Sequence, residues 1–416
     1  MVDILRHQLN SGLHLIAEPV AGAQSLAMSM LMPAGVCAEP SDRQGVVAVL
    51  AEMLTRGAGD RDAKAHCEAL DQLGVQRSTD VYVHHLQLSA TMLGQQLAGA
   101  LPLLIDMIRR PRLESASLEP CRTLALQSIA SLDDEPQDRT FIHLRRQHVP
   151  EPFGRSTLGQ REHVEAVTID DVRQHWRRHF VPRPAVLAFA GQFDWPQLKD
   201  LVEQQLGDWT GHVALPSPTA QSPRGYLHDS ADSTQVHIGL AYDAVAEPHP
   251  DSVLQRVANS VLTGGMSARL FTEIRERHGL CYAVYSQYAS DRDRGVMLAY
   301  AGTTTPRAQQ TLDLLIAELH RLAEGVTASE FDRAVVGMKS SLVMQGESTS
   351  ARATAIAVDQ TVLGEPRTLA ERAAEIDAVD LDRLNGFLRE HRPGPMTIVT
   401  IGPTALKLES TETALT

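Results

Sequence analysis

The feature that most constrains this chain of 416 residues is an internal repeat. Four short segments of the first half recur in the second half, in the same order and at offsets of about 205 to 211 residues. The matching pairs are 38–40 with 246–248, 54–57 with 262–265, 158–159 with 363–364, and 185–191 with 396–402. One three-residue match carries little weight, but four in a common order predict a duplicated folding unit.

A linker is predicted between the two copies. Residues 212–225 hold three prolines and several small residues, a composition typical of connecting segments. We therefore predict an N-terminal domain over residues 1–211 and a homologous C-terminal domain over 226–416. In the first half, apolar strand patterns such as 25–32 mix with helical patterns such as 95–109, without a strict strand–helix–strand rhythm. This mixture favours the α+β class over a doubly wound parallel sheet.

Composition excludes several classes of partner. Acidic residues outnumber basic ones by 51 to 38, a net charge of −13, which argues against nucleic acid or an anionic membrane surface. The four cysteines lie far apart and form no C-x-x-C pair, which is typical of a reducing compartment. The first 20 residues contain charges and no long apolar run, so we expect neither a signal peptide nor a membrane span, and a cytoplasmic protein.

Six segments carry a resemblance to a known family. They are LNSGLHLIAEP (9–19), AGVCAEPSDRQGVVAVLAEMLTRGA (34–58), SLDDEP (131–136), FGRSTLGQREHVEAVTIDDVRQHWRRHF (153–180), VLAFAG (186–191) and LTGGMSARLFTEIRERHGLCYAVYS (262–286). In this order they resemble the pitrilysin/insulinase family of zinc peptidases, which includes the mitochondrial processing peptidase and bacterial two-domain relatives. The resemblance covers nearly the whole chain. It implies two homologous α+β domains, each a mixed or antiparallel sheet with helices on one side, facing each other as a clamshell.

The zinc motif of that family is degenerate in this sequence. In H-x-x-E-H, two imidazoles on adjacent helical turns bind Zn²⁺ and a glutamate polarises the bound water. By the resemblance, these positions fall on Ala48, Ala51 and Glu52, and Gln127 and Ser128 stand where a later helix has an acidic pair. A methyl group cannot bind a metal, and one carboxylate does not hold zinc. We therefore predict no metal, no cofactor and no catalytic residues in this chain.

The second half retains groups that the first half lacks. Family members have an arginine and a tyrosine seven residues apart, held to contact the substrate backbone and the developing oxyanion; Arg275 and Tyr282 have that spacing. Spacing alone favours a solvated helix charge and a packed strand residue, whereas the surrounding match GGMSARLFTEIRERHGLCY favours the substrate-binding interpretation. Gly264 and Gly265 correspond to a glycine-rich loop linked to substrate handling in the family, and the alternative is a helix-start turn with unusual backbone angles.

Other candidate clusters have simpler interpretations. His175 and His179 lie four residues apart on a predicted helix, and we expect them on a solvated basic face rather than in a metal site. His84 and His85 are adjacent in a predicted strand over 81–91, so their side chains should point to opposite faces. Ser128 has no visible histidine and aspartate partners, so a serine hydrolase is not supported.

These observations predict a zinc-less peptidase-family subunit that is inactive alone. It should pair, as a heterodimer, with a second family subunit that carries H-x-x-E-H and the zinc, and help bind an unfolded peptide. A homodimer is the alternative assembly. The alternative is a scaffold or peptide-binding protein with no role in proteolysis, like the family's relatives in the respiratory cytochrome bc1 complex. A third hypothesis is an active metalloendopeptidase with an unrecognised metal site.

Overall fold

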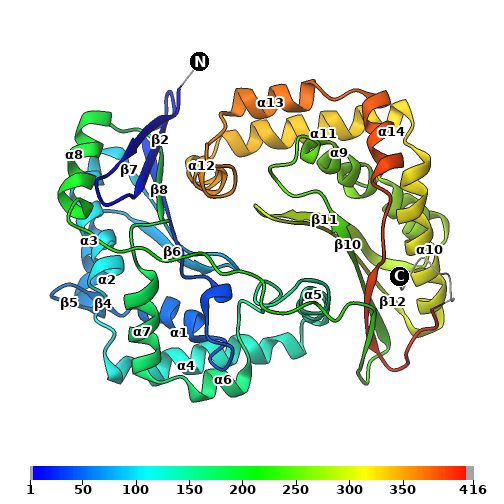
Figure 1. Cartoon of the computed structure of the whole chain (residues 1–416), viewed down its shortest axis with the longest axis horizontal. Helices are drawn as coiled ribbons and strands as arrows, with labels where there is room; N and C mark the ends of the chain where they lie inside the picture. The colour runs from blue at the N-terminus through cyan, green and yellow to red at the C-terminus, as the bar shows by residue number, and fades with distance from the viewer. Residues whose placement is uncertain (1–2, 409–416) are drawn as a thin grey trace. The chain divides into compact units, whose positions relative to one another are not determined.

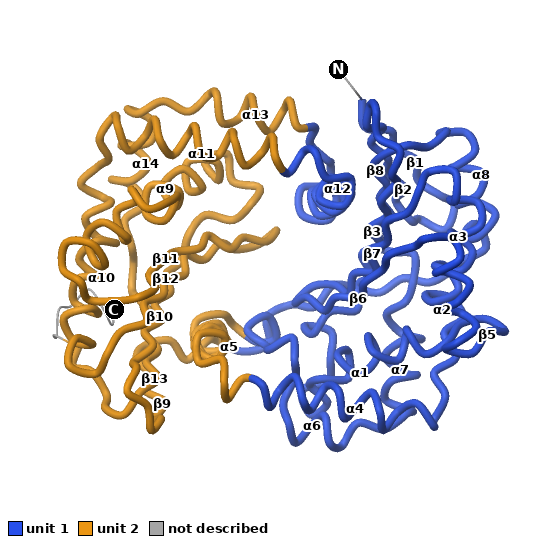
Figure 2. Tube along the Cα trace, turned by 180° about the vertical axis from the view of Figure 1, so that it is seen from behind, with its two compact units in different colours: residues 1–131, 151–220, 345–368 blue, residues 132–150, 221–344, 369–416 orange. Residues whose placement is uncertain are grey.

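The computed structural model describes residues 3–408, which form two compact units (Figure 2). Unit 1 contains residues 1–131, 151–220 and 345–368, and unit 2 contains 132–150, 221–344 and 369–416. The chain passes between the units at 131–132, 150–151, 220–221, 344–345 and 368–369. Each unit also takes one segment from the other half of the sequence.

Unit 1 is built on a six-stranded sheet with the order β1-β2-β8-β3-β7-β6. Its strands are β1 (Leu5–Gln8), β2 (His14–Pro19), β3 (Ser25–Met32), β6 (Gln76–Val81), β7 (Leu86–Leu93) and β8 (Val186–Gly191). Neighbours pair antiparallel, except β2 and β8, which are parallel. A small hairpin of β4 (Gly57–Ala58) and β5 (Arg61–Asp62) lies outside this sheet.

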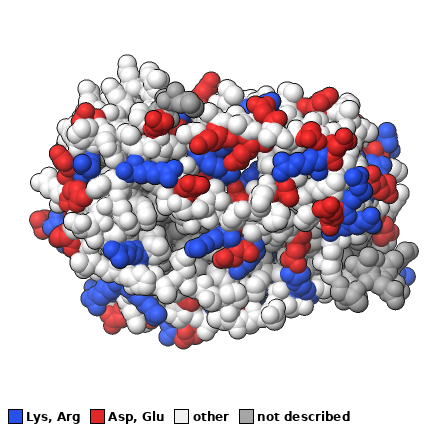
Figure 3. Space-filling view, turned by 45° about the horizontal axis from the view of Figure 1, so that its top comes forward, with Lys and Arg blue, Asp and Glu red and all other residues white. Residues whose placement is uncertain are grey.

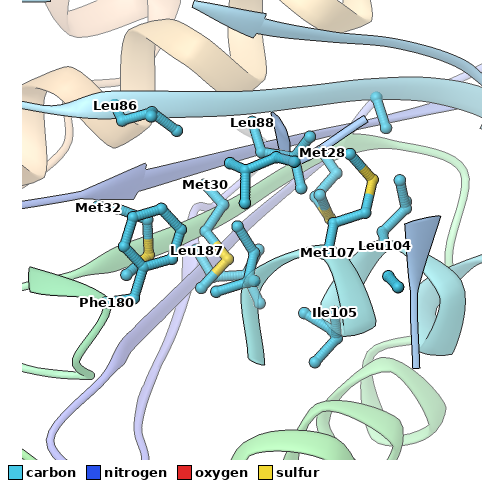
Figure 4. Packing of buried hydrophobic residues seen from close by; sticks show 14 of the residues in the cluster. Met28, Met30, Met32, Leu86, Leu88, Leu104, Ile105, Met107, Phe180 and Leu187 are labelled. Atoms are coloured by element: carbon cyan, nitrogen blue, oxygen red, sulfur yellow. The ribbon is translucent and has the colours of Figure 1, made fainter. Parts of the chain in front are cut away.

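Helices cover one face of this sheet and enclose the main core of unit 1. They are α1 (Val46–Met53), α2 (Ala63–Gln72), α3 (Leu97–Arg109), α4 (Ser115–Ala130), α6 (Arg161–Ala166), α7 (Ile169–His179) and α8 (Trp195–Leu206), with short turns η1 (Val36–Ala38), η2 (Gly94–Gln96) and η3 (Ser131–Asp133). Because successive strand residues point to opposite faces, Met28, Met30 and Met32 all enter the same core. Figure 4 shows Met28 beside Leu104 and Met107 of α3, and Met32 beside Phe180.

Unit 2 repeats this arrangement on a five-stranded sheet with the order β11-β12-β10-β13-β9. Its elements are β9 (Tyr226–Ser230), β10 (Gln235–Ala244), α9 (Ser252–Thr263), η4 (Phe271–Arg277), β11 (Cys281–Ser290), β12 (Gly295–Thr304), η5 (Thr305–Arg307), α10 (Ala308–Arg321), η6 (Leu322–Glu324), α11 (Ala328–Gly346), α13 (Leu369–Asp377), α14 (Leu381–Glu390) and β13 (Thr397–Gly402). The single parallel pair is β13 with β9, which matches β8 with β2 in unit 1. The segments 185–191 and 396–402 are thus equivalent strands, as the repeat predicted.

One helix on the opposite face of each sheet comes from the other half of the sequence. Helix α12 (Thr349–Leu363) packs on β3 and β8 of unit 1, and α5 (Pro136–His148) packs on β10 and β13 of unit 2 (Figure 1). Small residues permit this close packing: Ala27, Ala190 and Ala353 form one buried cluster in unit 1. The sequence predicted helices on one side only, since it contains no local signal for such an exchange.

Polar contacts fix both exchanged helices. In unit 1, Arg352 of α12 makes a two-pronged ion pair with the buried Glu18 of β2, with Nε–Oε2 and Nη2–Oε1 distances of 3.0 and 2.5 Å. In unit 2, Arg139 of α5 donates to Asp229, and the buried His148 contacts the Thr397 hydroxyl at 2.8 Å. Each unit is therefore held together partly by contacts between residues far apart in the sequence.

Local predictions were partly confirmed, with one correction. Strand β3 has the predicted bounds, and Thr168 caps α7 in a capping box with Asp171. The predicted strand over 81–91 was wrong at its start, because His84 and His85 lie in the turn between β6 and β7. Alternating apolar residues on both sides of that turn concealed it.

Two further observations concern the surface. Within residues 3–408, no helix has both the length and the apolar character needed to cross a membrane. On the face shown in Figure 3, acidic and basic side chains are interspersed. That face therefore presents no extended surface of one sign.

Candidate functional site

Helix α1 carries the degenerate motif and starts from a buried carboxylate. The Oε1 atom of Glu39 accepts hydrogen bonds from the backbone nitrogens of Gly45 and Val47, each at 2.9 Å. Burial raises the pKa of the Glu39 carboxyl to about 8, although the two backbone donors and Arg155 oppose this rise. Gly45 has a φ of 114°, a left-handed conformation that favours glycine. The Glu39 carboxylate and the left-handed Gly45 thus fix the start of the motif helix.

The side chains on α1 cannot form the family's zinc site. Ala51 is buried in the core, and Ala48 packs half-buried against it. Glu52 is half-buried, and its carboxylate has no hydrogen bond or ion pair with another residue of the described chain. Only one oxygen donor therefore remains among the three motif positions.

Helix α4 packs against α1 but adds no strong metal ligand. Gln127 and Ser128 are both exposed, and the Ser128 hydroxyl donates to the Leu124 carbonyl oxygen at 3.1 Å. Between residues 3 and 408, no group of three or more histidine, cysteine, aspartate or glutamate side chains is arranged to hold a metal ion. The residues present do not fit a catalytic zinc, because two alanine methyl groups occupy positions of ligand and base.

Arg275 and Tyr282 lie close together in unit 2, on η4 and at the start of β11. The connection between them turns at Gly279, which has a φ of 60°, and Tyr282 is 72% exposed. Burial raises the pKa of the neighbouring Cys281 thiol to about 11, and the positive charge of Arg275 opposes this rise, which places the guanidinium near the first residues of β11. The predicted seven-residue spacing thus brings an exposed cation and an exposed phenol to one region.

Both groups are available to a ligand. Arg275 is exposed, and its guanidinium lies 4.7 Å from the centre of the Phe271 ring. Neither the Arg275 guanidinium nor the Tyr282 hydroxyl has a hydrogen-bond or ion-pair partner among the described residues. A planar cation and a phenol with free donors can both bind a carbonyl or carboxylate oxygen.

Gly264 and Gly265 border an open hollow of about 470 Å³ beside α11. Gly265 has a φ of 145°, and a side chain there would meet nothing within 4 Å, so its conformation, not its size, favours glycine. Met266 and Val336, which also line the hollow, are 76% and 63% exposed. This is a mostly apolar surface in the same unit as Arg275.

The histidine pair on α7 was predicted on a solvated face, and this was wrong. His175 and His179 are both buried, with ring centres 4.5 Å apart, and each approaches a backbone carbonyl of the segment after β3. Burial lowers their pKa values to about 3 and about 4, so both rings are neutral near pH 7. Flanking arginines on the exposed side of α7 suggested a basic face, and they concealed the apolar side on which the histidines lie.

Two contacts were not predicted. Phe271 lies four residues before Arg275, a spacing that places two side chains on one face of a helix, so this spacing was the available signal. In unit 2, His148 bridges Thr397 and Asp243 across three elements, but both His148 and Thr397 are fully buried. These contacts therefore anchor α5, and the buried His148 and Thr397 cannot present a nucleophile to a substrate.

Two family models match the chain in consecutive segments. The model described as Insulinase (Peptidase family M16) matches residues 16–161, and that described as Peptidase M16 inactive domain matches residues 166–338. Together with the two α+β units, these matches define the chain as a two-domain peptidase-type protein. The chain belongs to the insulinase family, peptidase family M16.

Relatives and solved structures agree with this assignment. The chain is 26% identical to the uncharacterized zinc protease YmxG of Bacillus subtilis, over 96% of this chain and 98% of that protein. It is 27% identical to the uncharacterized zinc protease SCO5738 of Streptomyces coelicolor, over 96% and 90%.

Among solved structures, a peptidase M16 inactive domain from Pseudomonas fluorescens has a TM-score of 0.87 at 19% identity and covers 98% of this chain and 99% of its own. A protease from Helicobacter pylori has a TM-score of 0.88 at 18% identity, covering 97% and 100%. A chain of complex III2 from Candida albicans has a TM-score of 0.81 at 18% identity, covering 96% of each. These likenesses show that the two-domain fold is shared across the full length.

Proposed function

We propose that this chain is a zinc-less subunit that binds peptide substrate and pairs with a zinc-bearing member of the same family. One asymmetry carries the proposal. The motif positions in unit 1 lack metal ligands and a base. Arg275 and Tyr282 in unit 2 are exposed and have no hydrogen-bond or ion-pair partner among the described residues. A chain that had lost every role in peptide binding would have no need to keep an unpaired guanidinium at that position.

The partner would supply the metal and the attacking water. This chain would supply donors to a peptide carbonyl through Arg275 and Tyr282, and an apolar surface beside Gly264 and Gly265. A guanidinium N–H and a phenol O–H both stabilise an oxygen whose negative charge grows in the transition state. An extended, unfolded peptide offers such carbonyls without competing secondary structure. Among the described residues no disulfide joins the four cysteines, which supports a reducing, cytoplasmic location.

Co-expression with a family member that carries H-x-x-E-H tests the pairing. The chain alone should bind no stoichiometric zinc and cleave no peptide, while the purified pair should contain the partner's zinc and cleave an extended peptide. In the pair, Arg275→Ala should lower kcat/KM by about 100-fold or more, as loss of an oxyanion donor does. Arg277→Ala is the matched control, because Arg277 is equally exposed on η4 but pairs with Glu273.

Two other functions remain as alternatives, each supported by a particular comparison. The complex III2 chain shares the fold, which supports a scaffold role; stable pairing with unchanged cleavage in the Arg275→Ala and Tyr282→Phe variants would favour it. Relatives named zinc proteases support an active metalloendopeptidase. Stoichiometric zinc and peptide cleavage by the chain alone would establish that function and contradict the proposal.

A further inference from the structure

The segment that carries Arg275 has an uncommon helix type. Residues Phe271–Arg277 form a π-helical turn, a geometry that is rare and frequent at functional sites. Within it, the Arg275 guanidinium lies over the half-buried Phe271 ring, 4.7 Å from the ring centre. This distance is well inside the range of a cation–π contact.

The two arginines of this turn have opposite environments. Arg277 binds both carboxylate oxygens of Glu273, at 2.8 and 3.0 Å, so its charge is neutralised within the protein. Arg321 approaches the same carboxylate at 3.7 Å. Arg275 has no carboxylate partner in the described chain and contacts an aromatic ring instead. No carboxylate of the described chain therefore compensates the charge of Arg275.

An aromatic ring holds a guanidinium differently from a carboxylate. It contacts the flat face of the cation and leaves the N–H groups at the edge free, whereas a carboxylate would occupy those N–H groups and compete with a ligand. We infer that Phe271 is a positioning residue for Arg275, which presents its guanidinium edge, still charged, to a carbonyl or carboxylate of a bound peptide. The inference rests on the proposed function for its ligand and on η4 alone for its geometry.

A spectroscopic test needs no ligand or partner. In the full chain with ¹⁵N-labelled arginine, the Arg275 Nε–H signal, assigned by its loss in Arg275→Lys, should show an upfield ring-current shift of its proton. Phe271→Leu should move this signal to the position of an unstacked arginine, and Phe271→Tyr should leave it shifted. An unchanged Arg275 signal in Phe271→Leu would overturn the inference, whether or not the chain acts with a partner.

A kinetic test uses the co-purified pair and an extended peptide. Phe271→Leu should lower kcat/KM about two- to five-fold, the range expected from one exposed cation–π contact, and Phe271→Tyr should restore it. In the Arg275→Ala background, Phe271→Leu should have no further effect, because the ring acts only through the guanidinium. Equal losses for leucine and tyrosine, or a loss that persists without Arg275, would overturn the inference by showing a general packing role.

The two tests separate failure of the inference from failure of the proposed function. If the pair does not form or does not cleave peptide, the proposed function fails, and the Arg275 signal still decides the role of Phe271. If the pair is active and the Arg275 signal does not depend on Phe271, the inference fails while the proposed function stands.

Discussion

Replacing Arg352 by methionine should destabilise unit 1 strongly, although Arg352 belongs to the C-terminal half of the sequence. The Arg352 side chain is 14% exposed, and that of its partner Glu18 is 4% exposed. Methionine fills a similar volume but leaves the Glu18 carboxylate buried without its cation. Breaking a buried ion pair in this way costs about 3–5 kcal/mol of unfolding free energy. For a unit of this size, that corresponds to a fall in Tm of roughly 6–20 °C.

Tryptophan fluorescence measures this effect on unit 1 alone. All three tryptophans of the chain, Trp176, Trp195 and Trp209, lie in unit 1, so their emission during urea unfolding reports that unit and not unit 2. The matched control is the double variant Glu18→Leu with Arg352→Met. It removes the stranded charge together with the pair, and should recover most of the lost stability, since a buried ion pair is often no better than apolar residues of similar volume.

Two results would refute this reasoning. A loss below about 1 kcal/mol for Arg352→Met would mean that the pair is effectively solvated, as surface ion pairs are. A double variant no more stable than the single one would mean that the cost comes from lost packing of α12 and not from the uncompensated carboxylate.

Three further predictions concern other parts of the chain. Gly239→Val should destabilise unit 2 by about 1–3 kcal/mol, because even a Cβ atom there would lie 2.7 Å from the Thr140 side chain of α5. Hydrogen exchange of the β10 amides measures this loss, and exchange equal to wild type would contradict the prediction. Below pH 6.5 the unfolded chain protonates His175 and His179 while the folded chain does not, so these two histidines should lower the stability of unit 1 by up to about 1.4 kcal/mol per pH unit each, down to about pH 4. The raised pKa of Glu39 acts in the opposite direction over the same range, so tryptophan-monitored unfolding is compared between wild type and the His175→Leu, His179→Leu variant, whose stability should fall less as the pH is lowered. Restoring the motif should create a site for one zinc per chain, measured by atomic emission, and the same variant with Ala48 retained should bind far less. The substitutions for that restoration are Ala48→His, Ala51→Glu, Glu52→His and Gln127→Glu.

Local chemistry explains what the sequence predicted well. Strand β3 is a short, nearly continuous apolar run, and the Thr168–Asp171 cap needs only residues three apart, so both follow from neighbouring residues. The loss of the zinc motif is likewise a matter of residue identity, since an alanine cannot bind metal in any fold. Arg275 and Tyr282 lie on consecutive elements, η4 and β11, which one short turn joins.

Burial and long-range packing explain the features that the sequence predicted poorly. His175 and His179 read as solvent-exposed because Arg177 and Arg178 lie between them, and only the packing of α7 shows which side faces the core. The four-residue spacing of Phe271 and Arg275 allows contact on a helix, but only the structure shows the guanidinium over the ring.

The sequence by itself determined that this protein is a duplicated α+β peptidase-family chain without the groups for its own zinc. Those properties reside in residue identity and in the order of segments, which survive without any knowledge of packing. The tertiary structure decided that the two copies exchange α5 and α12, so that neither half of the sequence contains all of its own unit. It decided this because the open face of each sheet is covered by whichever helix reaches it, and that pairing depends on the path of the chain in space and not on neighbouring residues.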